Sequence, residues 1–344
     1  MRFFPAALFL VCVCAAARGE EIRIEIARGA RQARVEAAGK AHTVSVRGGQ
    51  VLVDGAPGAA GFAGPLTLDG QELAGRLELF ADKGGLVAVN AVDLEDYVAA
   101  VVASEVPPSW PAEALRAQAV AARTFAVAQK IAQGPGARAH LGASVLDQVY
   151  KGTAHPEPAP RQAARDTAGE VLTWGAAPIA AYFSASCGGR SESAEDAFHL
   201  TKGSTPYLRG GDPDDDARAW TKRIPLAAIS AALRKAGRMK SEVQSLRIAS
   251  RTGSGRARTL SLQTAGGARS LAAVELRQLI GYRELPSLFF EVAVDGPDAV
   301  FTGKGSGHGV GLCQWGARGR ALKGAGYREI LAHYYPGAEL RRMY

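Results

Sequence analysis

Residues 91–130 of this 344-residue chain read AVDLEDYVAAVVASEVPPSWPAEALRAQAVAARTFAVAQK, and the rest of the sequence is best understood outward from this stretch. Its first part predicts a helix, because apolar residues recur from Leu94 to Val102 at the i, i+3, i+4, i+7 spacing of one buried stripe. Asp93 directly precedes the stripe and Asp96 follows three residues later, a carboxylate variant of the capping box. We therefore expect a helix that begins after Asp93 and buries one face.

Two prolines, Pro107 and Pro108, follow that stripe and cannot continue a helix, so the first helix must stop near Ser104. Pro111 is well placed to open a second helix, whose alanine-rich run to Lys130 has high helix propensity. The stretch thus predicts two helices that are joined by a proline-bearing elbow.

Glu105 lies at this elbow, directly after the apolar helix and before the prolines. A carboxylate at a helix C-terminus meets the negative end of the macrodipole, and apolar neighbours such as Val106 and Trp110 desolvate it. Both effects raise the pKa of the carboxyl, which is the condition for a general acid near neutral pH. The residues alone leave open the alternative of a solvated glutamate at a frayed helix end.

Three segments in this order carry a resemblance to a known family. They are DLEDYVAAVVASEVPPSWPAEALRAQAVAARTFA at 93–126, AYFSASCGG at 181–189, and GKGSGHGVGLCQWGARGRALKGAGYREILAHYYPG at 303–337. From about residue 86 to the C-terminus the chain resembles the sporulation stage II protein D and amidase-enhancer LytB family (SpoIID/LytB). The members of that family that act as enzymes are lytic transglycosylases on peptidoglycan, and their catalytic glutamate corresponds to Glu105.

The resemblance implies a reaction that needs only one carboxyl group, whereas hydrolysis of a glycan usually employs two. Glu105 would protonate the glycosidic oxygen and then, as a carboxylate, accept the proton of the muramic acid C6 hydroxyl. That hydroxyl attacks C1 of its own ring and leaves a 1,6-anhydroMurNAc end. The resemblance further suggests that stem peptides are removed from the MurNAc-GlcNAc strands first. The predicted substrate-binding residues are Arg123, Tyr182, Ser184, Cys187, His308, Gln314 and Trp315.

Some of these residues have a structural alternative. Arg123 could equally form an ion pair that fixes the helices, and His308 and Trp315 could simply be packed. Glycines at every second position from Gly303 to Gly311 fit neither nucleotide-binding template and instead permit close backbone approach or unusual φ angles. Such a backbone would let these two side chains and Gln314 line a groove for sugar rings.

Two other functions remain open. The first is a noncatalytic, wall-binding enhancer of an N-acetylmuramoyl-L-alanine amidase, as the LytB name implies. The second is a cysteine peptidase, with Cys187 or Cys313 as nucleophile and His308 as base. Some family members bind zinc near the AYFSASCGG turn, but Cys187 and the nearby His199 are an incomplete ligand set, so we expect no metal or other cofactor.

The N-terminus, MRFFPAALFLVCVCAAARGE, predicts a signal peptide over residues 1–19, with cleavage after Ala17 or slightly later. Its apolar run is too short for a permanent transmembrane anchor. We therefore expect export to the periplasm, cell wall or extracellular space. The net charge of +8 suits an anionic wall or membrane surface, and the chain carries no aromatic-and-basic nucleic-acid motif. The expected partners are peptidoglycan glycan strands and a cell-wall amidase.

The remainder predicts an α+β fold. Residues 20–85 form a β-rich region, since residues such as Ile22 and Ile24 alternate with charged ones and Gly and Pro turns separate the strands. For residues 86–344 the family resemblance implies a SpoIID-like domain of helices packed on mixed and antiparallel strands around a glycan cleft. In its subregion 220–290 we expect helices at 226–236 and 272–280 and strands around 245–250 and 259–263.

Three smaller expectations concern segments between the motifs. Residues 170–173 and 179–183 are predicted as strands, the second of which runs into the AYFSASCGG turn. The segment LDQVYKGT at 146–153 resembles the family's stretch beside the active cleft. The basic Gly/Ser-rich segment 251–258 is predicted to be a solvated hairpin loop rather than a contact for glycan.

Overall fold

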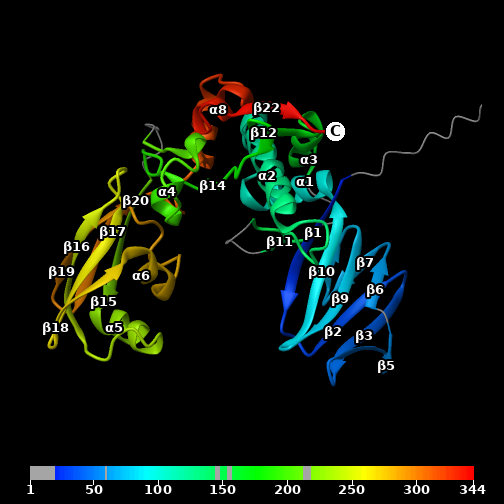
Figure 1. The fold of residues 1–344 in the computed structure, drawn as a ribbon, viewed down its shortest axis with the longest axis horizontal. Coiled ribbons are helices and arrows are strands. Elements are labelled where there is room, and N and C mark those ends of the chain that lie inside the picture. Colours follow the sequence, from blue (N-terminus) through cyan, green and yellow to red (C-terminus); the bar gives the residue numbers. More distant parts are fainter. Residues whose placement is uncertain (1–19, 59, 144–147, 153–156, 212–217) are drawn as a thin grey trace, which may run out of the picture.

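The computed structural model describes residues 20–58, 60–143, 148–152, 157–211 and 218–344, and its fold is of the mixed α+β class, as predicted. Figure 1 shows three parts: the N-terminal strands lie on one side of a central helical part, and a second module of strands and helices, residues 219–304, lies on the other. The predicted signal peptide, residues 1–19, lies outside the described residues.

The N-terminal part is built from two sheets that enclose their own apolar core. One sheet has the strand order β11-β1-β10-β9-β6 and the other β5-β4-β3-β2-β7-β8. The strands are β1 (Glu21–Arg28), β2 (Gln32–Ala37), β3 (Lys40–Arg47), β4 (Gln50–Val53), β5 (Ala56–Pro57), β6 (Ala60–Ala63), β7 (Leu66–Leu68), β8 (Gln71–Leu73), β9 (Arg76–Asp82), β10 (Gly85–Asp93) and β11 (Leu141–Gly142). Strand β10 begins at the predicted domain boundary, pairs with β1 and β9, and runs directly into the first helix.

The two-helix prediction is confirmed. Helix α1 (Leu94–Glu105) ends at the elbow and α2 (Ala112–Gln133) begins after Pro111. Asp93 caps α1, because its Oδ1 accepts hydrogen bonds from the backbone N–H groups of Glu95 at 2.8 Å and Asp96 at 3.4 Å. The capping carboxylate therefore fixes where the chain turns from sheet into helix.

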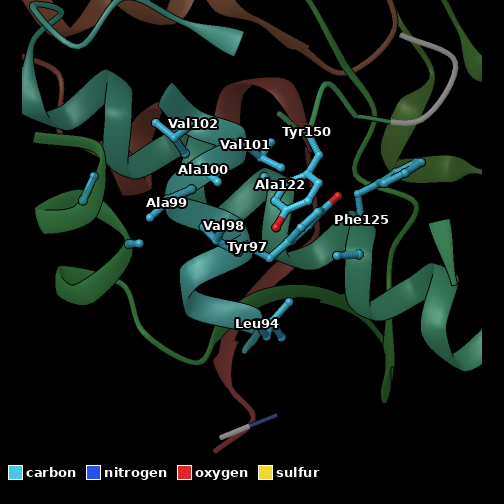
Figure 2. Close-up of a cluster of buried hydrophobic side chains, with 14 of the residues drawn as sticks. Leu94, Tyr97, Val98, Ala99, Ala100, Val101, Val102, Ala122, Phe125 and Tyr150 are labelled. Atoms are coloured by element: carbon cyan, nitrogen blue, oxygen red, sulfur yellow. The ribbon is translucent and has the colours of Figure 1, made fainter. Parts of the chain in front are cut away.

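The apolar stripe of α1 is fully buried in a cluster to which α2, the helix at Pro158–Asp166 and β1 also contribute. Figure 2 shows this cluster, in which Tyr97 and Tyr150 lie side by side with their ring centroids 5.3 Å apart. The alanine-rich sequence of α2 lets its neighbours approach closely on several sides, since most of its residues from Ala114 to Val127 are buried. Helix α2 thus forms the centre of the molecule, in contact with α1, α3 (Pro158–Asp166), α7 (Gln314–Leu322) and α8 (Tyr327–Tyr334).

The remaining central elements surround α2. They are β12 (Glu170–Trp174), β13 (Ala177–Pro178), β14 (Phe183–Ser184), α4 (Ala194–Phe198), the 3₁₀ turn η1 (Pro206–Leu208), β21 (Leu312–Cys313), α7 (Gln314–Leu322), α8 (Tyr327–Tyr334) and β22 (Glu339–Arg342). The predicted strand at 179–183 is wrong. Its backbone makes tight turn bonds from Ala181 N to Ile179 O and from Tyr182 N to Ala180 O, and only Phe183–Ser184 pairs, in parallel with Leu312–Cys313.

The second module has its own core, between two three-stranded sheets and two helices. Its elements are β15 (Ala219–Pro225), α5 (Leu226–Lys235), β16 (Val243–Arg251), β17 (Ala257–Thr264), β18 (Gly267–Ala272), α6 (Ala273–Ile280), β19 (Phe290–Asp295) and β20 (Asp298–Lys304). Both predicted helices and both predicted strands of this region are confirmed. None of the helices in the described part of the chain combines the length and apolar character that a membrane crossing requires.

The glycine run after β20 has the unusual backbone that its sequence predicts. Gly305, Gly307, Gly309 and Gly311 have φ angles of +79°, +105°, +79° and +68°. A Cβ atom on Gly307 would lie 2.7 Å from Ser184 Cβ, and one on Gly311 would lie 2.0 Å from the carbonyl oxygen of Tyr182. These glycines therefore bring the run against the AYFSASCGG segment, where no larger residue fits.

Candidate active site

A cavity of about 610 Å³ lies between the central part and the second module. One wall comes from the elbow after α1, the 182–185 segment, α4 and the glycine run, and the other from the β16–β17 hairpin and α6. The polar side chains that line it are Glu105, Tyr182, Ser184, Glu192, Asp196, His199, Thr252, Arg256, Arg258, Arg277, Gln278, Tyr282, Ser306 and His308. The cleft is thus shared by segments that are far apart in the sequence.

Glu105 lies in this cavity as a half-buried side chain at the last position of α1. Its Oε1 accepts a hydrogen bond from Val149 N at 2.9 Å, and its Oε2 accepts one from Gln314 Nε2 at 3.2 Å. Burial raises the pKa of the Glu105 carboxyl, and the two hydrogen bonds oppose that rise only in part. A protonated carboxyl inside a cavity can donate a proton to a bound molecule.

Val149 belongs to the LDQVYKGT segment that the sequence places beside the cleft. Within that segment, residues 146–147 and 153 lie outside the described residues, whereas Val149 both lines the cavity and donates to Glu105. Gln314, at the first position of α7, is buried, and its Nε2 also lies 3.5 Å from Gln118 Oε1. A predicted site residue therefore contacts Glu105 directly.

Tyr182, Ser184 and His308 are brought together on the cavity wall. The hydroxyl of Ser184 accepts a hydrogen bond from Gly309 N at 3.2 Å, and the Tyr182 and His308 rings lie 6.0 Å apart between centroids. Burial and then the positive charges of Arg277 and Arg256 lower the pKa of His308 to about 4. His308 is therefore neutral at physiological pH and acts as a hydrogen-bonding group, not as a cation.

Trp315 is not a wall of the cavity. The Arg218 guanidinium lies 3.3 Å from the ring centroid, and the ring packs edge-on against Trp110 at 4.9 Å. Because the guanidinium occupies a face that a sugar would need, the packed alternative for Trp315 describes its position better than the sugar platform. Trp315 thus packs against the elbow that carries Glu105, through its contact with Trp110.

Arg123 also lies elsewhere than the predicted substrate site. Its side chain is fully buried, forms an ion pair with Glu95, and donates to the carbonyl oxygens of Ala164 at 3.0 Å and Glu170 at 3.2 Å. Those bonds join α2 to α1 and α3 and leave the guanidinium no access to the cavity. The alternative of a helix-fixing ion pair is the one that the geometry matches.

Cys187 and Cys313 are adjacent in the core, and neither lines the cavity. No disulfide joins their side chains, which are 1% and 0% exposed, and Cys187 N donates to Cys313 Sγ at 3.2 Å. Nor does His308 face a thiol, since its Nδ1 accepts from Val310 N at 3.0 Å. Substrate binding by Cys187 and the cysteine peptidase alternative both fail on this burial.

The structure adds residues that the sequence reasoning missed. Arg256 belongs to the segment predicted as a solvated loop, yet it is 3% exposed and donates to Cys187 O at 2.6 Å and Arg190 O at 3.0 Å. The hairpin itself is confirmed. Its predicted solvation is right for Arg251 and Arg258, which are exposed, and wrong for Ser254 and Arg256, which are buried. Glu192 is buried as well, and its Oε2 accepts from Thr252 Oγ1 at 2.5 Å. The dense basic composition of residues 251–258 was the available signal.

Arg277, Gln278 and Tyr282 are further missed residues, all from α6 or the turn after it. Their predicted helix gave no sign that one face would meet the cleft. Across the described ranges, no group of three or more His, Cys, Asp or Glu side chains is arranged to hold a metal ion. His199 lies in the cavity wall, and residues 212–217, in which the sequence offered no second cysteine, are outside the described part.

Fold and site together define an α+β protein with a protonatable glutamate at a helix end inside an interdomain cleft. A family profile described as stage II sporulation protein (SpoIID) matches residues 82–174, which include that glutamate, and a domain of unknown function (DUF8618) matches residues 210–311. The chain is 33% identical to stage II sporulation protein D of Bacillus amyloliquefaciens, over 74% of this chain and 75% of that one. It belongs to the stage II sporulation protein D family.

Two further proteins are similar to this chain. An uncharacterized protein of Brachyspira hyodysenteriae is 34% identical over 80% of this chain and 73% of its own. The amidase enhancer of Bacillus subtilis is 30% identical over 70% of this chain, but over only 39% of its own length. The family resemblance that the sequence motifs indicated is thus confirmed.

Proposed function

We propose that this protein is a peptidoglycan lytic transglycosylase that cleaves MurNAc-GlcNAc strands and leaves 1,6-anhydroMurNAc ends. One observation carries the proposal: Glu105, at the position of the family's catalytic glutamate, is a cavity-lining carboxyl whose pKa is raised by burial. Burial therefore favours the protonated form of this carboxyl, which is the form that a general acid requires.

The roles of the neighbouring groups follow from their contacts. As a carboxylate, Glu105 still has donors on both oxygens, from Val149 N and Gln314 Nε2, so the same group can act as the base in the second step. Ser184 accepts from Gly309 N, and its own O–H remains to donate to a sugar hydroxyl. His308 lines the same wall as a neutral ring whose Nδ1 accepts from Val310 N.

The reaction balances without water. The Glu105 proton goes to the glycosidic oxygen, the bond from muramic C1 to that oxygen breaks, and the GlcNAc side leaves with a new hydroxyl. The C6 hydroxyl of the same muramic ring then attacks C1, and its proton returns to Glu105. Alignment of these atoms in the cavity replaces a separate nucleophile.

The test is mass spectrometry of peptide-free glycan strands after incubation with the protein and with Glu105→Gln. Anhydro ends from the parent protein, reduced by at least about a hundredfold in the variant, are the expected result. Reducing ends in place of anhydro ends would mean hydrolysis, and Glu192 and Asp196, the other carboxylates of the cavity, would then be the candidates for a second group. Bound but intact strands would refute cleavage.

The second candidate function is enhancement of a cell-wall amidase, and the observation that favours it is the similarity to the amidase enhancer of Bacillus subtilis. In that case stimulation of an N-acetylmuramoyl-L-alanine amidase would survive Glu105→Gln, since no proton transfer is involved. A transglycosylase that only opens the wall for an amidase would lose stimulation with the same substitution. The two functions are therefore separated by one variant in one coupled assay.

Either function places the protein outside the cytoplasmic membrane, and we infer that residues 1–19 direct export and are removed. The N-terminal sequence of the protein recovered from cells tests this: it should begin shortly after Ala17. A protein that retains Met1 in the cytoplasmic fraction would contradict the inference.

A further inference from the structure

The cavity wall supplied by α6 holds a cation, Arg277, that forms no ion pair with any carboxylate of the described residues. Arg277 donates from Nε to Leu285 O at 2.8 Å and from Nη2 to Pro286 O at 2.7 Å. Both acceptors are neutral carbonyl oxygens, so they fix the guanidinium in place without balancing its charge. Among the described residues Nη1 has no hydrogen-bond partner, and no carboxylate lies within 4.0 Å of the guanidinium nitrogens.

The other two arginines of the cavity differ from Arg277 in this respect. Arg258 forms an ion pair with Asp196. Arg256 is joined to the Glu192 carboxylate through Ser254, whose hydroxyl accepts from Arg256 Nη1 at 2.8 Å and donates to Glu192 Oε2 at 2.9 Å. Arg277 is therefore the arginine of this wall whose charge remains available to a bound molecule.

Two observations locate that charge inside the site. Burial lowers the pKa of Arg277 to about 10, so the side chain is desolvated but still protonated at neutral pH. Its charge is also one of the causes that depress the pKa of His308, on the opposite wall. The Tyr282 ring lies 4.6 Å from the guanidinium carbon and remains 38% exposed, so it presents an aromatic surface beside the cation.

We propose that Arg277 binds a carboxylate carried by the glycan, and that this carboxylate is the lactyl group of muramic acid freed from its stem peptide. The inference rests on the proposed glycan substrate and adds a residue that determines its specificity. GlcNAc carries no ionisable group, and a lactyl group that still bears a peptide is a neutral amide. A guanidinium with free N–H groups in a desolvated cleft distinguishes these cases, because charge-assisted bonds to carboxylate are the stronger ones.

The consequence is a fixed register of the strand. A carboxylate at Arg277 places a muramic ring, not a GlcNAc ring, in the cavity that holds Glu105. Only the muramic ring on the C1 side of the broken bond yields an anhydro product. The second module, which carries Arg277, would thus select strands without stem peptides and determine which glycosidic bond lies at Glu105.

Binding is measured in the Glu105→Gln background, where the proposed reaction does not proceed. Three ligands of equal length are compared: peptide-free strands, the same strands with their lactyl groups converted to methylamides, and GlcNAc oligomers. We expect the peptide-free strands to bind about tenfold more tightly than either neutral ligand. With Arg277→Gln the ratio of the affinity for peptide-free strands to that for the neutral ligands should fall to near one. Arg277→Lys should keep part of this preference, and the preference should then depend more strongly on salt.

Arg269→Gln is the matched control, since it removes the same charge from an exposed position of β18 outside the cavity and should retain the full preference. Because each protein is compared with itself on charged and neutral ligands, a general loss of stability does not imitate the effect. Equal binding of all three ligands by the parent, or an unchanged preference in Arg277→Gln, would overturn the proposal.

The outcome is separable from that of the proposed reaction. If the protein prefers carboxylate ligands but forms no anhydro ends, Arg277 is a binding residue and the protein is not a transglycosylase. If anhydro ends form without that preference, the protein is a transglycosylase and Arg277 does not recognise the carboxylate. Failure of every ligand to bind would remove the glycan substrate and this inference with it.

Discussion

Burial raises the pKa of Glu105, whereas the hydrogen bonds from Gln314 and Val149 lower it. Both donate to the carboxylate form and so lower the pKa that desolvation raises. A general acid is active while protonated, so its activity falls as the pH rises through its pKa. We predict that Gln314→Leu, which removes one donor, raises the pKa of Glu105 and moves the alkaline limb of the pH profile of kcat/KM to higher pH, with a severalfold larger share of activity retained there.

The profile is more informative than the absolute rate, which Gln314→Leu can lower for other reasons. Gln162→Leu serves as control, because Gln162 is exposed and its side chain donates to Asp166, on the same helix. Its profile should match that of the parent. An alkaline limb that moves to lower pH in Gln314→Leu would mean that Glu105 is not the titrating acid.

Single residues also show where sequence reasoning reaches its limit. The sequence located Glu105 and predicted its raised pKa, because a helix end and apolar neighbours are local features. It placed Arg123 and Trp315 in the substrate site, since a side chain's chemistry does not reveal which partner already occupies it. Glu95 lies 28 residues before Arg123, and Arg218 nearly 100 residues before Trp315. Both contacts arise only from the tertiary fold.

At the scale of elements, the junction of β14 and β21 depends on glycine. Gly311 has φ +68°, and an added Cβ would meet the Tyr182 carbonyl oxygen at 2.0 Å. Because backbone cannot move aside cheaply, we predict that Gly311→Ala lowers the free energy of unfolding by about 2–3 kcal/mol. Gly319→Ala, in α7, where an added Cβ would meet nothing within 4 Å, should instead raise it by about 0.5–1 kcal/mol.

Thermal or urea denaturation of the two variants measures this difference. The pair shares the same chemical change, so opposite signs would identify the backbone contact as the cause. Equal destabilisation by both would mean that the glycine run tolerates side chains and that its close approach to the 182–184 segment is not required.

Helices α1, α2, α5 and α6 were predictable because each has a periodic or alanine-rich run that proline or glycine bounds, whereas α3, α4 and α7 were not predicted. The predicted strand at 179–183 failed because its apolar residues are buried against α2 and α8, while Ala181 N and Tyr182 N bond within short local turns instead of to a neighbouring strand. Burial and strand pairing leave the same pattern in so short a run. Likewise, the hairpin at 251–258 was predicted from its turn residues, but the acceptors that bury Arg256 lie more than 60 residues earlier.

At the scale of the whole molecule, the cleft exists only while the second module is held against the central part. Arg256 does much of this, since it donates from one module to Cys187 O and Arg190 O in the other and to Ser254 Oγ, which in turn donates to Glu192. Cys187, Ser254 and Glu192 are buried, so a bond lost from this network leaves a desolvated partner.

We therefore predict that Arg256→Met lowers the free energy of unfolding by about 3 kcal/mol, roughly one per lost bond. Hydrogen exchange should accelerate in residues 219–304 and in the 187–192 segment, while the N-terminal sheets keep their protection. Glycan cleavage should be lost with it, because one wall of the cavity moves away from Glu105. Arg258→Met, on the same hairpin but with a half-exposed partner pair, should cost less than about 1 kcal/mol. Uniformly faster exchange in Arg256→Met would instead mean that the two parts unfold as one unit, and that Arg256 stabilises the fold without positioning the module.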